Sequence, residues 1–319
     1  MQETLLTRGP SLCEDPLRLD IRLQCPRCRT DLAGLSCMQC GLRMRSDRGV
    51  VNALPPERAA YFARFMEDYE RIRAAEGRGG ESQEFYLNIP YRDSSGRNSG
   101  QWYIRARSYQ CLIDSVLEAP ASHSSVLDLG AGNCWMSYRL ALLGYRPVAV
   151  DLLTNADDGL QAAMHYRHAL PKAFPRFQAE LTRLPFQGEQ FDVVIFNASF
   201  HYSEDYEASL REALRCLRRG GMVVISDTAW YSREESGRKM VAERQAAFLQ
   251  KYGTASDSIR SLEFLTDERL RTLEERLSIR WTKFYPRYGL KWAMRPLMAR
   301  LRGRREPSRF RIYAARKDA

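Results

Sequence analysis

The chain has 319 residues, enough for one well-buried domain of ordinary size plus a smaller module. Its formal net charge of +10 is concentrated at one end, because residues 280–319 carry thirteen Arg and Lys against two acidic residues. Such a field attracts polyanions such as RNA or an anionic lipid surface, although it can also be only a solvated face.

The sequence gives no sign of secretion or of a membrane span. No basic start is followed by a long apolar core, and no run approaches the roughly 18 apolar residues of a transmembrane segment. We therefore expect a cytoplasmic protein whose eight cysteines are metal ligands or reduced thiols rather than disulfides. Residues 1–20 show no periodic pattern, and we expect them to be a flexible lead-in.

Four cysteines define a small module over residues 21–56. Cys25 and Cys28 form one Cys-x-x-Cys pair, and Cys37 and Cys40 form a second pair eight residues later. Two such pairs can present four thiolates to one tetrahedral ion, which predicts a structural zinc site; the alternative is one redox-active pair beside an incidental one. The arginines around the cysteines suit contact with RNA phosphates, or a ribbon that only packs on the rest of the chain.

Residues 57–124 are predicted to form a helical lid or linker. Apolar positions recur at helical spacing over 57–76, and a second helix is expected over 102–117, after a polar, glycine-rich loop. Arg105 and Arg107 of this second helix could meet a carboxylate of a cofactor or substrate, although solvation explains them as well.

From residue 125 onward, strand-like and helix-like stretches alternate, which predicts an α/β domain with a doubly wound parallel sheet. The expected strands are 125–129, 147–151, 176–180, 191–197, 222–227 and, near the end, 278–284 and 309–316. The expected helices are 133–143, 156–169, 205–218 and 233–251.

The first of these strands runs into a glycine-containing turn, Gly130-Ala131-Gly132, with Asp128 two residues ahead of it. The turn lacks the third glycine of the dinucleotide fingerprint, and a carboxylate at Asp128 would repel a pyrophosphate. It would instead suit S-adenosylmethionine, which carries an ammonium and a sulfonium. Asp151 lies 21 positions after Gly130, where a carboxylate is expected to meet ribose hydroxyls.

Four segments in order, 126–134, 179–186, 191–197 and 218–225, resemble the class I S-adenosylmethionine-dependent methyltransferases of the type 11 kind. The resemblance implies a seven-stranded Rossmann-like sheet that ends in an antiparallel hairpin. The cysteine module resembles the N-terminal zinc ribbon of bacterial ribosomal-RNA guanine methyltransferases. The cofactor contacts that the resemblance implies are Asp128, Gly130, Ala131 and Gly132 at the amino-acid end, Asp151 and Leu152 at the ribose, Glu180 and Leu181 at the adenine, and Asn197.

Two polar residues, Asn197 at the end of the fourth strand and His201 just beyond it, lie near the position of the acceptor site in that family. His201 could act as a general base that titrates near neutral pH, or form only part of the pocket wall. Asn197 could direct its amide at a polar acceptor atom, or cap the following turn. We keep both residues as catalytic candidates.

A basic insert occupies residues 286–308 of the 125–319 methyltransferase domain. Leucines and methionines recur at helical spacing over 290–301, with Trp292 near the start and a kink expected at Pro296. The part from 286 to 305 could lie on an anionic membrane surface, brace RNA or cap the acceptor pocket.

The methyl acceptor is the open question in the sequence. A small or lipid-like acceptor is favoured, because residues 85–107 and the insert can enclose a pocket. The first alternative is methylation of a ribosomal or transfer RNA base, and the second is a non-catalytic partner protein that only binds the cofactor.

Overall fold

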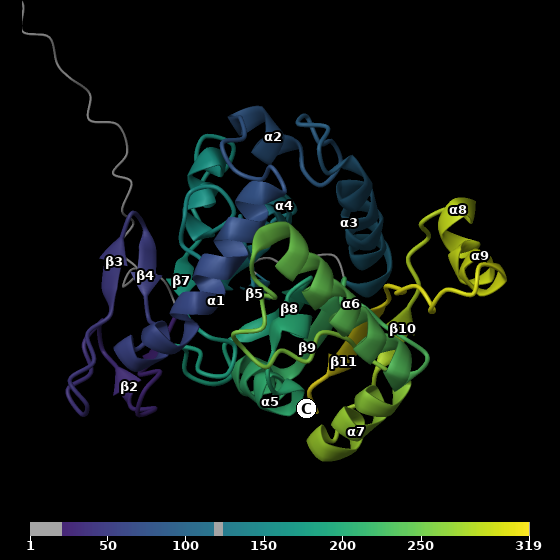
Figure 1. Ribbon diagram of the computed structural model, residues 1–319. Coiled ribbons are helices and arrows are strands. Elements are labelled where there is room, and N and C mark those ends of the chain that lie inside the picture. The colour runs from purple at the N-terminus through teal and green to yellow at the C-terminus, as the bar shows by residue number, and fades with distance from the viewer. Residues whose placement is uncertain (1–20, 118–123, 319) are drawn as a thin grey trace, which may run out of the picture.

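The central sheet contains seven strands in the order β10-β11-β9-β8-β5-β6-β7 in this computed structural model, which describes residues 21–117 and 124–318 (Figure 1). Strands β7, β6, β5, β8 and β9 run parallel, whereas β11 is antiparallel to β9 and to β10. The predicted doubly wound seven-stranded sheet is thus confirmed. The expected lead-in at residues 1–20 lies outside the described residues. The strands are β5 (Ser125–Leu129), β6 (Arg146–Asp151), β7 (Arg176–Gln178), β8 (Phe191–Asn197), β9 (Leu217–Ser226), β10 (Thr282–Phe284) and β11 (Ile312–Arg316).

The strand order reverses at β5, which has β6 on one side and β8 on the other. Leu129 at the end of β5 pairs with Val150 of β6 and with Phe196 of β8. The carboxyl ends of three parallel strands therefore lie side by side at this point. Doubly wound sheets bind their ligands in the crevice outside such a reversal.

Helices cover both faces of the sheet, and the side chains of β5 alternate between them. Leu127 and Leu129 enter one buried cluster together with Leu210, whereas Val126 enters the other together with Tyr138. Burial on both faces explains why Val126, Leu127 and Leu129 of this strand are all apolar. The helices that follow β5 are α4 (Trp135–Leu142), α5 (Tyr206–Cys216), α6 (Glu234–Tyr252) and α7 (Asp267–Leu277).

One segment that we predicted to be an α-helix, 156–169, contains only a 3₁₀ helix at Leu160–Tyr166. The side chain of Asn155 accepts hydrogen bonds from the backbone N–H groups of residues 157, 158 and 159, which holds that stretch in turns. Conversely, α7 was not predicted. Its start does carry a recognisable signal, since the Thr266 side chain caps the N–H of Arg269.

The cysteine module is joined to the sheet through its second hairpin. Strands β1 (Leu23–Gln24) and β2 (Asp31–Leu32) form a separate pair, whereas β3 (Arg45–Asp47) and β4 (Val50–Asn52) add to the sheet because β4 pairs in parallel with β7. The complete sheet therefore has nine strands among the described residues. We predicted residues 21–56 as a ribbon beside the sheet, and this continuity was not foreseen.

Helices from the N-terminal part of the chain lie over the edge of the sheet where its parallel strands end (Figure 1). The first begins at Pro56, a position at which proline is tolerated because the first N–H groups of a helix have no intrahelical acceptor. These helices are α1 (Pro56–Ala75), α2 (Gln83–Asn88) and α3 (Ser99–Cys111), the last continuing into a π-helical turn at Leu112–Val116.

The basic insert forms two short helices, α8 (Leu290–Ala293) and α9 (Arg295–Leu301), which project from the body of the molecule (Figure 1). The break between the helices falls at Met294, and Pro296 lies in the first turn of α9, where proline is tolerated because the first N–H groups of a helix have no intrahelical acceptor. No helix within residues 21–117 and 124–318 is long and apolar enough to cross a membrane.

Candidate functional site

The turn after β5 is a tight glycine elbow. Gly130 has a φ of +76°, and a Cβ at this position would lie 2.2 Å from the Cβ of Ser199. Ser199 in turn donates a hydrogen bond from its Oγ to the carbonyl of Leu129. Only glycine fits this close approach, so the backbone of the elbow stays exposed to a ligand.

Asp128 is a buried carboxylate directly beneath the elbow. Its Oδ2 accepts a hydrogen bond from Ser137 Oγ at 2.7 Å, and its Oδ1 has no hydrogen-bond partner among the described residues. Burial raises the pKa of Asp128 to about 7. One carboxylate oxygen is therefore available for a positively charged ligand group.

Asp151 lies at the end of β6 and holds the elbow in place. Its Oδ2 accepts the N–H of Gly132 at 2.8 Å, and its Oδ1 accepts the N–H of Leu153 at 2.8 Å. Burial raises the pKa of Asp151 to about 6. The neighbouring Leu152 packs with the aromatic residues of α1. The ribose contact expected of Asp151 and Leu152 stays a prediction, and the structure adds a positioning role for Asp151.

Glu180 has a protein partner that the sequence did not indicate. Arg58 of α1 donates three hydrogen bonds to its two carboxylate oxygens, at 2.7, 2.9 and 3.0 Å. The carboxylate that the resemblance assigns to adenine binding is therefore already paired with the guanidinium of Arg58. The adjacent Leu181 packs against the core cluster of the sheet. Adenine contact by Glu180 and Leu181 stays a prediction.

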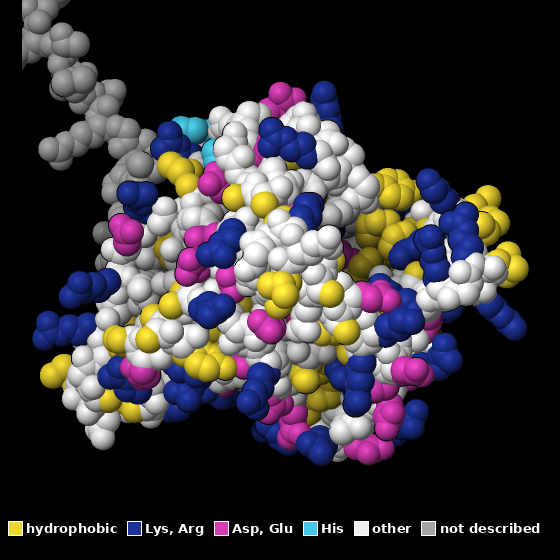
Figure 2. Space-filling view, in the orientation of Figure 1, with side chains coloured by type: hydrophobic (Ala, Val, Ile, Leu, Met, Phe, Trp, Pro, Cys, Tyr) yellow, Lys and Arg dark blue, Asp and Glu magenta, His cyan; other side chains and the backbone are white. Residues whose placement is uncertain are grey.

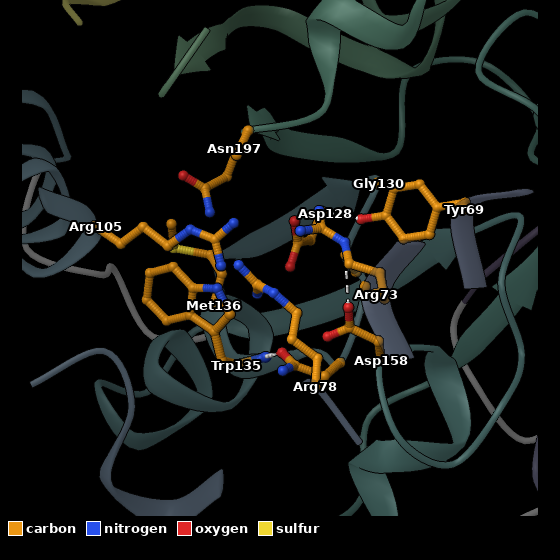
Figure 3. A pocket seen from close by; sticks show the side chains of 14 residues that line it. Tyr69, Arg73, Arg78, Arg105, Asp128, Gly130, Trp135, Met136, Asp158 and Asn197 are labelled. Carbon is orange, nitrogen blue, oxygen red and sulfur yellow. Dashed lines mark hydrogen bonds and ion pairs between the residues drawn. The ribbon is translucent and has the colours of Figure 1, made fainter. Parts of the chain in front are cut away.

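A polar cavity of about 60 Å³ opens over the elbow (Figure 3). Three guanidinium groups from the lid, those of Arg73, Arg78 and Arg105, converge there with the amide of Asn197 and the carboxylate of Asp128. Cations opposite a buried carboxylate can hold both charges of an amino-acid zwitterion. Ala131 lines the same cavity.

The three arginines differ in how they are held. Arg73 donates to Tyr69 Oη at 2.6 Å and to Glu76 Oε2 at 3.1 Å, and Arg78 donates to Gln101. Arg105 instead lies over the ring of Trp102, 4.8 Å from its centroid, and pairs with no carboxylate among the described residues. Burial lowers the pKa of Arg105 to about 10, so it remains a cation that is free to meet an anionic group.

A second cavity, of about 590 Å³, adjoins the first and shares Arg73, Arg105 and Ala198 with it. Its walls come from several elements that are distant in sequence. They include Ile104 of α3, Met240 and Arg244 of α6, and Trp292 and Phe310 of the basic insert and its C-terminal neighbour.

His201 lines this larger cavity with an imidazole whose Nδ1 is enclosed and has no hydrogen-bond partner among the described residues. Burial lowers its pKa to about 4, so the imidazole is neutral at neutral pH. The expectation that it titrates near neutrality is therefore corrected. A neutral imidazole can still accept a proton or wall the pocket, and these two roles stay open.

Asp227 is a site residue that the sequence reasoning missed. It follows β9 and lines the larger cavity; Ser108 Oγ donates to its Oδ1, and its Oδ2 has no partner among the described residues. Burial raises the pKa of Asp227 to about 6. The available signal was its position, because an acidic residue directly after a buried parallel strand lies at the same edge of the sheet as Asp128 and Asp151.

The four cysteines come together as the spacing predicts. All four sulfur atoms lie within 4.8 Å of one another, and the Sγ–Sγ distances from Cys25 to Cys40 and from Cys28 to Cys37 are 3.5 Å. A tetrahedral zinc ion with Zn–S bonds of about 2.3 Å needs sulfurs about 3.8 Å apart. The donor set therefore fits a closed four-thiolate metal site.

Arginines of the cysteine module point toward the rest of the protein. Arg27 pairs with Glu57 of α1 at 2.6 Å, and Arg29 pairs with Glu212 of α5 at 2.5 Å. The backbone of Arg22 exchanges hydrogen bonds with the side chain of Gln190. These contacts favour a ribbon that packs on the rest of the chain.

The part of the chain that contains the elbow is similar to known methyltransferases. Residues 127–225 match the family model of a methyltransferase domain. The chain is similar to the demethylmenaquinone methyltransferase of Mycobacterium marinum (strain ATCC BAA-535 / M), with 35% identity over 102 residues, which are 32% of this chain and 40% of that protein. It is also similar to the malonyl-[acyl-carrier protein] O-methyltransferase of Yersinia pestis, with 28% identity over 113 residues, 35% of this chain and 40% of that protein.

Among solved structures, the chain is similar to an S-adenosylmethionine dependent methyltransferase from Mesorhizobium loti, with a TM-score of 0.47 and 18% identity over 67% of this chain and 100% of that chain. The present chain spans about two fifths of the length of the curated relatives above. The matched segment runs from β5 to β9 and contains the elbow. This part of the chain accordingly matches a methyltransferase domain, and the curated proteins that it resembles are methyltransferases.

Proposed function

We propose that this protein transfers a methyl group from S-adenosylmethionine to a small or lipid-like acceptor. The observation that carries the proposal is the pair of adjoining cavities, one polar and placed over the glycine elbow, the other larger and partly walled by aromatic side chains. Because the two cavities share Arg73, Arg105 and Ala198, a group bound over the elbow would lie next to the larger cavity. This is the arrangement that in-line displacement requires.

The cofactor would be held by the residues of the elbow and the lid. Asp128 would face its ammonium group, and Arg105, with the amide of Asn197, would face its carboxylate. When bound, S-adenosylmethionine supplies a methyl group on an already activated sulfonium. The protein then has to align the acceptor, exclude water and, where the acceptor must lose a proton, accept that proton.

Two groups in the larger cavity are suited to accept a proton from the acceptor. Asp227 has an unpartnered oxygen and a pKa raised to about 6, whereas the enclosed His201 has a pKa lowered to about 4. A base works best when its pKa is close to the operating pH, which favours Asp227 over His201. We assign Asp227 the role of general base and His201 that of a wall or hydrogen-bonding group.

The character of the larger cavity supports a small or lipid-like acceptor. Trp292, Phe310, Ile104 and Met240 give it apolar walls, as pockets for small molecules generally have. The relatives named above act, by their names, on demethylmenaquinone and on a malonyl-acyl carrier protein. The ribbon arginines that would otherwise suggest RNA are partly engaged with the protein itself.

We further propose that Cys25, Cys28, Cys37 and Cys40 hold one structural zinc ion. Four thiolates without an open position leave no place for a substrate, so the ion would stabilise the ribbon and take no part in methyl transfer. The compact arrangement of the four sulfurs supports this assignment.

Binding of the cofactor product, S-adenosylhomocysteine, tests the first proposal by calorimetry. We expect Asp151→Ala to abolish binding, because both the ribose contact and the hydrogen bond to Gly132 are lost, and Asp257→Ala, an exposed acid, to leave it unchanged. Transfer of labelled methyl groups to fractions of a cell extract then reports the acceptor. Label in the small-molecule or lipid fraction supports the proposal, and label confined to RNA overturns it.

A further inference from the structure

The part of the insert from 289 to 304, named here the basic projection, is fixed at both ends, and between them the ring of Trp292 stacks on that of Phe310. At one end Tyr288 Oη lies 2.8 Å from Ser108 Oγ, and at the other Arg305 Nε lies 2.5 Å from Glu243 Oε2. Neither α8 nor α9 contains a buried residue. The two short helices therefore project from the body of the protein and are not buried against it (Figure 1).

The basic projection exposes an unusual amount of aliphatic surface. Leu290 is 83% exposed, Leu301 is 72% exposed, and Leu297 and Met294 are 56% and 50% exposed. Leaving such side chains in water gains nothing for folding, since each could contribute about 1.5–3 kcal/mol if it were buried. A cluster of this kind marks an interaction surface.

Positive charge surrounds these apolar side chains. Residues 289–305 contain six Arg and Lys and no acidic residue. Among the described residues no carboxylate pairs with Lys291, Arg300, Arg302 or Arg304, whereas most arginines on the body have acidic neighbours. Figure 2 shows the hydrophobic and basic side chains together on the projection at the edge of the molecule.

We propose that the basic projection docks on the surface of an anionic lipid bilayer. A bilayer interface offers an apolar layer for the exposed leucines and a negatively charged surface for the cations that have no acidic partner within the described part of the chain. Nucleic acid would satisfy only the charges, because it is bound through phosphates and stacked bases rather than through aliphatic side chains. The aliphatic exposure therefore favours lipid over RNA.

Docking in this way would bring the larger cavity next to the bilayer. Trp292 of the projection lines that cavity, and Arg295 lies over the Trp292 ring at 3.8 Å from its centroid. An acceptor that partitions into the membrane could then enter the cavity without crossing water. This second step rests on the proposed function, whereas the docking itself does not.

Flotation of the full-length protein with lipid vesicles tests the docking. We expect binding to vesicles that contain phosphatidylglycerol to be about tenfold or more tighter than binding to pure phosphatidylcholine vesicles, because each cation near an anionic surface adds to the attraction. The triple variant Leu290→Ser, Leu297→Ser and Leu301→Ser should lose about tenfold or more of the binding. The charge variant Arg300→Gln, Arg302→Gln and Arg304→Gln should lose the preference for the anionic lipid.

A matched control comes from exposed leucines elsewhere. The variant Leu142→Ser, Leu143→Ser and Leu249→Ser removes apolar side chains that are 47%, 43% and 58% exposed on the body, and it should bind vesicles like the unchanged protein. Unchanged vesicle binding by the projection variant overturns the proposal. So does retention of a single-stranded RNA without any vesicle binding. Calorimetry with S-adenosylhomocysteine in the same variants separates these outcomes from a failure of the proposed function, because the substituted residues lie outside the cofactor cavity.

Discussion

The guanidinium of Arg58 spans both carboxylate oxygens of Glu180, with nitrogen to oxygen distances of 2.7 to 3.0 Å. Glu180 is only 3% exposed, and Arg58 lies in the first turn of α1. The same guanidinium lies over the rings of Tyr61 and Phe62, at 4.4 and 4.9 Å from their centroids. This ion pair therefore connects the start of the lid to the edge of the sheet.

Replacing Arg58 with Gln should lower the free energy of unfolding by about 1–3 kcal/mol, because a buried carboxylate would lose its charged partner. The partial exposure of the arginine keeps the effect below that of a fully buried pair. Urea denaturation measures it. The control is Arg238→Gln, which breaks a more exposed pair with Glu234 within α6 and should cost about 0.5 kcal/mol or less. Equal effects of the two changes would contradict a stabilising role for the Arg58–Glu180 pair.

The raised pKa of Asp128 predicts a pH dependence of stability in the absence of cofactor. Its pKa rises from 3.8 to about 7 on folding, so between these values the folded state binds more protons than the unfolded state, and stability falls as the pH rises. His201, with its lowered pKa, acts in the opposite sense below pH 6.5. Between pH 6.5 and 7.5 the protein should therefore lose about 0.5–1 kcal/mol, and Asp128→Asn should remove most of this loss, since Asp151 and Asp227, with pKa values raised to about 6, contribute the remainder. Urea titrations at several pH values would refute the assignment if the variant kept the same slope.

The assignment of Asp227 as the base predicts how activity depends on pH. An acceptor proton can be taken only by the ionised carboxylate, so the rate should fall as the pH decreases through about 6. Asp227→Asn should lower kcat by about 10²–10⁴-fold for an acceptor that must lose a proton and should remove this acidic limb. His201→Asn should keep the limb. A pH–rate profile with its acidic limb intact in the Asp227 variant would instead assign the proton transfer to another group.

Removal of the proposed zinc ion should lower the stability of the whole chain and not only that of the ribbon. Small four-thiolate modules gain most of their folding free energy from the ion, and here the second hairpin of the module is part of the main sheet. Chelation, or the change Cys28→Ser, should therefore lower the melting temperature of the whole chain. Cys111→Ser, at a half-buried cysteine outside the cluster, should have little effect. Elemental analysis that finds far less than about one zinc per chain would rule out the site.

The elbow and the parallel sheet could be predicted from the sequence because their signals are local. Gly130 and Gly132 are needed where the backbone takes a positive φ, and buried parallel strands appear as apolar runs. The cysteine spacing likewise indicated a cluster, since each pair fixes its own geometry.

The contacts that the sequence did not predict all join distant segments. Nothing near Arg58 indicates that it meets Glu180, 122 positions later, and nothing in β4 indicates that its partner is β7. The lowered pKa of His201 also depends on packing from several elements, because its main cause is burial. Such properties arise only when the tertiary fold brings the segments together.

The pairing of β4 with β7 has a further consequence for association between molecules. Without it, β7 would present unsatisfied backbone groups along an open margin of the sheet, which is a template for joining other chains. With the hairpin in place, the edge strand is β3, a three-residue strand whose Arg45, Ser46 and Asp47 are all exposed. Short length and charged side chains are the features by which natural sheets discourage edge-to-edge aggregation. The β3–β4 hairpin, which follows the four cysteines in sequence, therefore also protects the edge of the sheet against association with other copies of the protein.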